Sequence, residues 1–148
     1  MSTRREDRMQ AVYTQLQTIS RRASARSRRT AEPLTLVQHT LLNFIDGTPE
    51  CRAIDIAGAM RLNRSTVSRQ VGDLQAIGLI EVGAVTAEQT SRGQLLTLSK
   101  RGRELLDRSI RANHDELERR LSEWSDDEID DLAAGLERFN ADEERSPS

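Results

Sequence analysis

IDIAGAMRLNRSTVSRQVGDL, residues 54–74, is the stretch that decides the fold of this chain, because it indicates two short helices joined by a tight turn. Asn63 is placed to cap the second helix, and Val67, Val71 and Leu74 share one face of it, which predicts a face turned to a core. The opposite face carries small, polar or basic residues: Ser65, Ser68, Arg69 and Gly72. Such a slim basic face suits a helix that enters the major groove of DNA. The stretch therefore predicts a helix-turn-helix.

A predicted β-hairpin follows the second helix. Gly78 is expected to end that helix in a left-handed conformation. Two apolar runs, residues 77–82 and 94–98, then flank a polar loop that contains Arg92 and Gly93, the pattern of a hairpin. Helix, turn, helix and hairpin together predict a winged helix. The expected fold class is mainly α with a small β-hairpin wing (α+β), with long helices at both ends of the chain.

The segments before the helix-turn-helix also read as helices. A first helix is predicted over residues 5–25, and a second opens at Thr35 with capping-box spacing to Gln38 and stops at Gly47. The following helix is predicted to start at Thr48-Pro49, with proline at its first position.

Two more helices are predicted after the wing. Ser99 is expected to cap a helix that runs to about Trp124, and residues 125–128 form a capping box that opens the last helix. The terminal helices carry apolar residues at helical spacing, more than a small winged core can cover. We therefore expect a homodimer joined through these helices, which also places two recognition helices about one DNA turn apart. A monomer that folds its ends over itself is the alternative. The apolar positions are Met9, Val12, Tyr13, Leu16, Ile19, Ala23, Leu106, Ile110, Leu117, Leu121, Trp124, Ile129, Leu132, Leu136 and Phe139.

Composition and charge agree with a soluble DNA-binding protein. Of the 148 residues 36% are hydrophobic, and no apolar run reaches membrane-spanning length, so no membrane partner is expected. The single cysteine, Cys51, excludes an internal disulfide and fits a cytoplasmic, nucleoid-associated location; we expect it to be inert. Residues 1–111 hold 18 basic and 11 acidic residues, whereas residues 112–148 hold 4 and 13. A basic body suits contact with phosphates, although a solvated charge run explains the acidic end equally well.

With these elements in order, the chain resembles the MarR family (multiple antibiotic resistance regulators) over residues 5–140. The segments that carry the resemblance are residues 34–42, 55–57, 63–69, 74–80 and 98–106. The resemblance implies a homodimeric, usually repressive transcription regulator on a pseudo-palindromic operator, often released by a small aromatic or phenolic ligand. It divides the chain into an N-terminal dimerisation helix with a basic linker (1–33), a winged helix-turn-helix core (34–99) and C-terminal dimerisation helices (100–148).

The chain departs from the family pattern at two positions. Arg61 stands where the family usually has glycine in the turn, which requires a left-handed arginine at a cost of about 1 kcal/mol, or a different turn. In the wing, Thr90 replaces the aspartate that usually steadies the arginine, here Arg92.

Several residues are candidates for DNA contact. Arg69 is expected to grip a guanine edge, with an ion pair to Asp73 as the alternative. Arg92 is expected to enter the minor groove from the wing. Residues of the first turns, Arg64, Ser65, Thr66 and Ser68, are expected to reach phosphates or base edges, and Arg52, Lys100 and Arg101 to contact phosphates, with surface charge as an equal alternative.

An effector pocket is expected where the first, second and fifth helices meet, with a filled junction as the alternative. Its candidate lining is Tyr13, His39, Phe44 and Asn113. His39, His114 and Cys51 lack metal-ligand spacing, so neither a metal nor another cofactor is expected. The chain shows no phosphate loop, nucleophile elbow or zinc-protease motif, which argues against an enzyme. A winged helix used for protein–protein docking is the alternative function.

Overall fold

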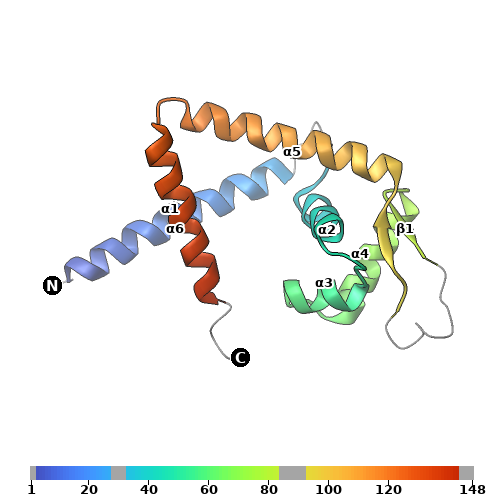
Figure 1. The fold of residues 1–148 in the computed structure, drawn as a ribbon. Coiled ribbons are helices and arrows are strands. Elements are labelled where there is room, and N and C mark those ends of the chain that lie inside the picture. Colours follow the sequence, from blue (N-terminus) through green and yellow to red (C-terminus); the bar gives the residue numbers. More distant parts are fainter. Residues whose placement is uncertain (1–2, 28–32, 84–92, 144–148) are drawn as a thin grey trace. The chain divides into compact units, whose positions relative to one another are not determined.

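A computed structural model describes residues 3–27, 33–83 and 93–143 of the chain (Figure 1). The chain divides into two compact units, Met1–Ile110 and Arg111–Ser148. In chain order, the elements are α1 (Arg4–Ser27), α2 (Leu36–Gly47), α3 (Ala53–Met60), α4 (Arg64–Ala76), β1 (Ile80–Val82), β2 (Leu96–Leu98), α5 (Lys100–Leu121) and α6 (Asp126–Glu143). The predicted helical fold with one small hairpin is confirmed.

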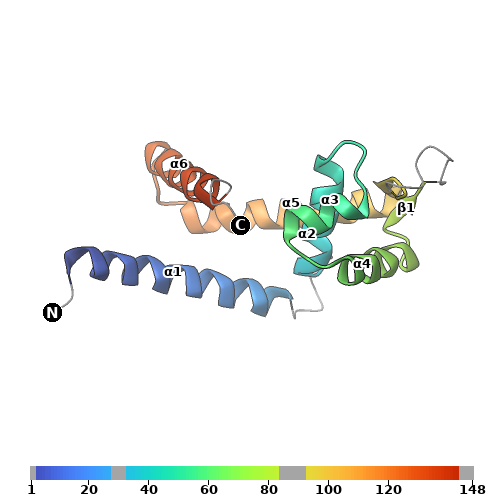
Figure 2. The same cartoon turned by 90° about the horizontal axis from the view of Figure 1, so that it is seen from below.

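The core of the first unit is aliphatic and lies among α2, α3, α4, the hairpin and the start of α5. Figure 2 shows α2, α3 and α4 gathered beside the hairpin. All five elements supply side chains that are almost fully buried, so the helix-turn-helix is fixed to the wing through one core. These residues are Leu34, Leu41, Leu42, Ile45, Cys51, Ile56, Val67, Leu74, Leu79, Ile80, Leu96 and Leu106.

The wing is an antiparallel hairpin, as predicted. β1 and β2 pair with Ile80 opposite Leu98 and Val82 opposite Leu96. The pairing also has a neighbour on its outer side, because the Leu96 N–H donates to the Cys51 carbonyl over 2.8 Å. The segment just before α3 is therefore joined to β2 by a backbone hydrogen bond at Cys51.

Side-chain caps define several helix ends, as predicted. Thr35 and Gln38 form a capping box at the start of α2, with each side chain bonded to the other's backbone N–H at 3.1 and 3.0 Å. Ser125 and Glu128 do the same at the start of α6. At the end of α4, Gly78 has φ +77°, its N–H donates to the Gln75 carbonyl, and Leu79 N–H donates to Leu74, the pattern of a Schellman cap.

The predicted start of the third helix at Thr48-Pro49 is wrong. α3 begins at Ala53, and Glu50 has a left-handed φ of +54°. The reason is tertiary, because Cys51 is buried and its carbonyl is bonded to β2, which keeps the backbone extended there. Two other helix ends differ slightly from the prediction: α1 covers Arg4–Ser27 instead of residues 5–25, and α5 ends at Leu121 instead of about Trp124.

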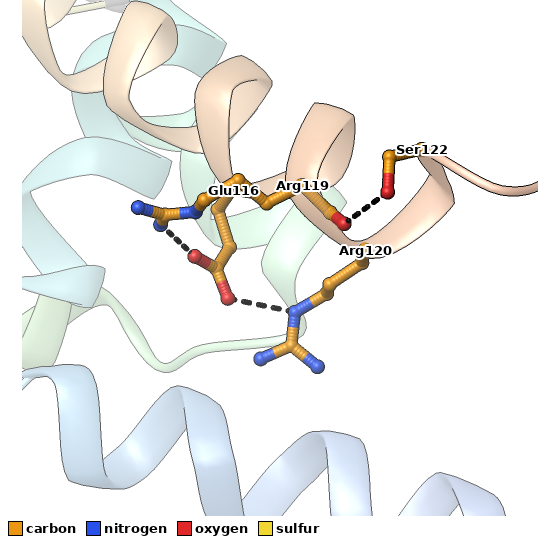
Figure 3. A network of polar contacts seen from close by, with 4 residues as sticks. All are labelled: Glu116, Arg119, Arg120 and Ser122. Carbon is orange, nitrogen blue, oxygen red and sulfur yellow. Dashed lines mark hydrogen bonds and ion pairs between the residues drawn. The ribbon is translucent and has the colours of Figure 1, made fainter.

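The second unit contains the last part of α5 and all of α6. Glu116 accepts hydrogen bonds from both Arg119 and Arg120, and Ser122 Oγ donates to the Arg119 carbonyl (Figure 3). The hydrogen bonds from the two guanidinium groups lower the pKa of the Glu116 carboxyl. Leu132, Leu136 and Phe139 of α6 are exposed, at 39 to 59% of their full surface. None of the helices in the described ranges is long and apolar enough to cross a membrane.

Candidate nucleic-acid interface

The recognition helix α4 has two opposite faces, as its sequence predicts. Val67 and Leu74 are 1% and 2% exposed and face the core, and Val71 packs against it. The other face is open to solvent. Its exposed residues are Arg64, Ser65, Ser68, Arg69 and Gly72, while Thr66 is half-buried.

The N-terminus of α4 is held by Asn63. The Asn63 Oδ1 atom accepts hydrogen bonds from the Thr66 N–H at 2.8 Å and from the Ser65 hydroxyl at 2.9 Å. The remaining backbone N–H groups of the first turn have no partner within the helix and, with the helix dipole, attract anions. Arg64 and Ser65 are exposed beside this helix end, so the arrangement is suited to a phosphate oxygen.

The tight turn before α4 uses an arginine in a glycine-like conformation. Arg61 has φ 52° and ψ 43°, which is the left-handed region, and the Leu62 N–H donates to the Ala57 carbonyl over 3.1 Å. Of the two alternatives for this departure from the family pattern, the structure selects the left-handed arginine. The turn therefore keeps its shape without glycine.

Arg69 lies at the edge of a shallow pocket between α2 and α4. Asp73 also lines this pocket of about 330 Å³, together with Thr35, Val37, Gln38, Leu41, Gln70 and Leu74. Among the ion pairs of the described residues none joins Arg69 to Asp73. The intrahelical ion pair considered as an alternative for Arg69 is thus absent, and its guanidinium is placed on the exposed face of α4.

The structure places the other predicted phosphate contacts on two elements. Lys100 and Arg101 are exposed in the first turn of α5, where Arg101 lies 4.0 Å from Glu104. Arg52 precedes α3 and donates from Nη1 to the carbonyl of Gly93, three residues before β2 of the wing, a contact that the sequence did not predict. Arg92 and Thr90 lie outside the described residues.

The predicted effector residues have different surroundings. Tyr13 is 55% exposed on α1 and accepts a hydrogen bond from Gln17 Nε2, whereas Phe44 packs against the core. His39 Nδ1 lies 2.7 Å from Ser109 Oγ, and burial lowers the pKa of the imidazole. Asn113 belongs to the second unit, so a pocket shared by all four stays a prediction. None of the four residues lines the pocket beside Arg69.

Two further features bear on reactivity: the thiol of Cys51 and the grouping of side chains that can bind metal ions. Cys51 is buried, and burial together with the nearby Asp55 carboxylate raises the pKa of its thiol to about 11, far from a reactive thiolate. Within the residues that the structure describes, no three His, Cys, Asp or Glu side chains are grouped to hold a metal ion.

One residue that positions the interface was missed in the sequence. Gly102 in the first turn of α5 is buried against the backbone of Leu79, and a Cβ added there would lie 1.9 Å from the Leu79 carbonyl oxygen. This close approach seats the end of α4 on α5. The only sequence signal for it is a glycine inside a predicted helix, where glycine is otherwise unfavourable.

Comparison with known proteins agrees with this geometry. The MarR family model matches residues 32–88. The uncharacterized HTH-type transcriptional regulator YxaD of Bacillus subtilis (strain 168) is 30% identical over 102 residues, which are 69% of this chain and 70% of YxaD.

Solved structures share the fold. A MarR family protein from Bacillus stearothermophilus has a TM-score of 0.79 and 20% identity, over 95% of this chain and 98% of that one. Streptococcus pneumoniae FabT in complex with DNA has a TM-score of 0.67 and 19% identity, over 95% of this chain and 96% of that one. The family model, the relative and the winged fold lead to one conclusion: this chain belongs to the MarR family, whose members are transcriptional regulators and not enzymes.

Proposed function

We propose that this regulator binds double-stranded DNA as a homodimer, at a pseudo-palindromic operator, through recognition helix 63–77 and wing 79–98. The observation that carries the proposal is the division of α4 into a buried aliphatic face and an exposed face of small, polar and basic residues. A helix fits the major groove when its outward side chains are short enough for close approach and charged enough for base and phosphate contacts.

Each predicted contact other than Arg52 has a chemical role in this proposal. Arg69 reads a guanine through two parallel N–H donors, because it stands on the exposed face and is not paired with Asp73. Arg64, Ser65, Thr66 and Ser68 contact phosphates or base edges around the capped N-terminus. Lys100 and Arg101 contact flanking phosphates, and Arg92 enters the minor groove. FabT, which shares the fold, has been solved in complex with DNA, and this supports the DNA partner.

Exposed apolar side chains on the terminal helices support the homodimer. Met9, Val12, Tyr13, Leu16 and Ile19 of α1 are each 37 to 60% exposed, at spacings that place them on one helix face. α6 repeats the pattern with Leu132, Leu136 and Phe139. Contiguous apolar surface of this kind marks an interaction site, and two copies of the chain cover it symmetrically.

Repression and release form the last part of the proposal. A dimer seated on an operator that overlaps a promoter blocks transcription, and a small aromatic or phenolic ligand releases it. The dimer exists with two different distances between its recognition helices, and the ligand acts by binding one of these conformations better than the other. A ligand with equal affinity for both would not shift the equilibrium between them. Tyr13, His39, Phe44 and Asn113 stay the candidates for contact with such a ligand; His39 and Phe44 lie on α2.

The test begins with the operator. Genomic fragments retained by the purified protein supply the preferred site, and affinity is then measured on that site and on random duplex. Arg69→Ala is expected to cost about 1–3 kcal/mol on the preferred site and little on random DNA. Arg101→Ala serves as the control for a phosphate contact and is expected to weaken both equally. Equal losses for Arg69→Ala on both would remove its reading role, and the absence of salt-dependent duplex binding would favour a protein-docking module.

A further inference from the structure

Arg52 occupies a helix position that arginine does not suit. It is the N-cap of α3, where Ser, Thr, Asp or Asn normally accept a backbone N–H of the first turn. The Arg52 side chain makes no cap hydrogen bond, and its own backbone N–H is instead accepted by the Asp55 carboxylate at 2.9 Å. The choice of arginine is therefore not explained by helix capping.

The Arg52 side chain reaches the segment that leads into β2 of the wing instead. Its Nη1 donates to the carbonyl of Gly93, 41 residues later in the chain. The preceding residue makes a second bond to the same strand, since the Cys51 carbonyl accepts the Leu96 N–H at 2.8 Å. Two consecutive residues before the helix-turn-helix thus bind residues 93–96, the segment that leads into β2, at two points.

We infer that Arg52 is a positioning residue that sets the wing relative to the recognition helix, rather than a phosphate contact. Gly93 directly follows Arg92 in the sequence, the proposed minor-groove residue, so a bond that fixes the Gly93 carbonyl acts one residue away from Arg92 along the chain. The wing of this chain also lacks the aspartate of the family pattern, where Thr90 stands. The effect on DNA rests on the proposed function; the attachment of the wing does not.

Arg52→Ser separates the two roles cleanly. Serine is a favoured N-cap, so the variant is expected to keep or raise the thermal midpoint, but serine is too short to reach Gly93. Arg101→Ser is the matched control, because it removes one exposed arginine from a proposed phosphate contact that is not bonded to the wing. Backbone amide NMR signals of residues 93–96 are compared in the free proteins, and operator affinity is measured over a range of salt concentrations.

The positioning role predicts a specific set of results. Arg52→Ser shifts the amide signals of residues 93–96, and Arg101→Ser leaves them unchanged. Operator affinity falls roughly ten-fold or more in Arg52→Ser, the loss expected from one hydrogen bond to a charged group. In an Arg92→Ala background the same substitution costs less than about two-fold, since coupled residues are not additive.

Two results would overturn the inference. Unchanged amide signals for residues 93–96 in Arg52→Ser would show that the bond does not hold the wing. The second result is an affinity loss for Arg52→Ser that is equally large in the wild-type and Arg92→Ala backgrounds. If the slope of log affinity against log salt concentration also became shallower by about 0.9, Arg52 would be an independent phosphate contact. If neither the wild type nor any variant binds duplex DNA, the proposed function fails, and the amide signals alone decide whether Arg52 positions the wing.

Discussion

Ser99 Oγ donates a hydrogen bond of 2.6 Å to the carbonyl of Gly78, the residue that ends the recognition helix. The backbone adds a second bond, from the Ser99 N–H to the Leu79 carbonyl at 3.0 Å. Ser99 also caps α5, because its Oγ accepts the Gly102 N–H at 3.0 Å. One side chain thus joins the end of α4 to the start of α5, the helix that leads out of the winged core.

Ser99→Ala is expected to destabilise the fold by about 1–2 kcal/mol, since it removes a cap and the bond to Gly78 together. Chemical unfolding followed by circular dichroism measures this. Ser125→Ala is the control, because Ser125 only caps α6 and its loss is worth about 1 kcal/mol. A smaller loss for Ser99→Ala than for Ser125→Ala would mean that the bond to Gly78 contributes nothing.

Two glycine-to-alanine substitutions are expected to act in opposite directions. Gly102→Ala forces a methyl to within 1.9 Å of the Leu79 carbonyl oxygen, so the backbone must shift, at a cost of about 1–3 kcal/mol or more. At Gly72 an added Cβ meets nothing within 4 Å among the described residues, and alanine there stabilises the helix by about 0.5–1 kcal/mol. The methyl of Gly72→Ala is also expected to weaken DNA binding, if α4 approaches the DNA backbone closely at this position. Thermal unfolding measures both effects, and equal midpoints for the two variants would contradict the close packing of Gly102 against Leu79.

The stability of the first unit is expected to fall at mildly acidic pH because of His39. Burial holds the pKa of its imidazole below the ordinary value of 6.5, so the unfolded chain binds a proton more readily than the folded one. The contribution of the neutral His39 imidazole to the free energy of unfolding is complete above pH 6.5. It is lost as the pH falls from there through the lowered pKa of the folded state. Asparagine places an amide near the position of Nδ1 and keeps a partner for Ser109 without titrating. The difference in unfolding free energy between wild type and His39→Asn should therefore change over this range, and a constant difference would exclude His39 as the cause.

The parts of the fold that the sequence predicts correctly are those set by neighbouring residues. The cap by Asn63, the end at Gly78 and the two faces of α4 depend on spacings of a few residues, and all three are confirmed. The hairpin follows for the same reason, since its strands alternate and pair locally. At Arg61 the sequence leaves two alternatives open, a left-handed arginine or a different turn, and the structure has the left-handed arginine.

The features that the sequence did not predict depend on contacts between distant residues. Pro49 has the local pattern of a helix start, but the bond between Cys51 and Leu96 delays α3 to Ala53. The bond from Arg52 to Gly93 and the packing of Gly102 on Leu79 likewise join residues more than 20 positions apart. No spacing rule reports such contacts, because they exist only once the chain has folded.

The last prediction concerns the dimer and uses the apolar face of α1. Leu16→Glu places a charge in the middle of that face, and burying it between two chains without a partner is unfavourable. Sedimentation equilibrium at micromolar concentration is expected to show two chains for the wild type and one for the variant. The variant should also lose operator affinity, because a single winged unit contacts only one half-site. Ala11→Glu, which adds the same charge on the opposite side of α1, is expected to stay dimeric. A wild-type monomer with full operator affinity would contradict the homodimer and leave these exposed side chains without the role proposed for them.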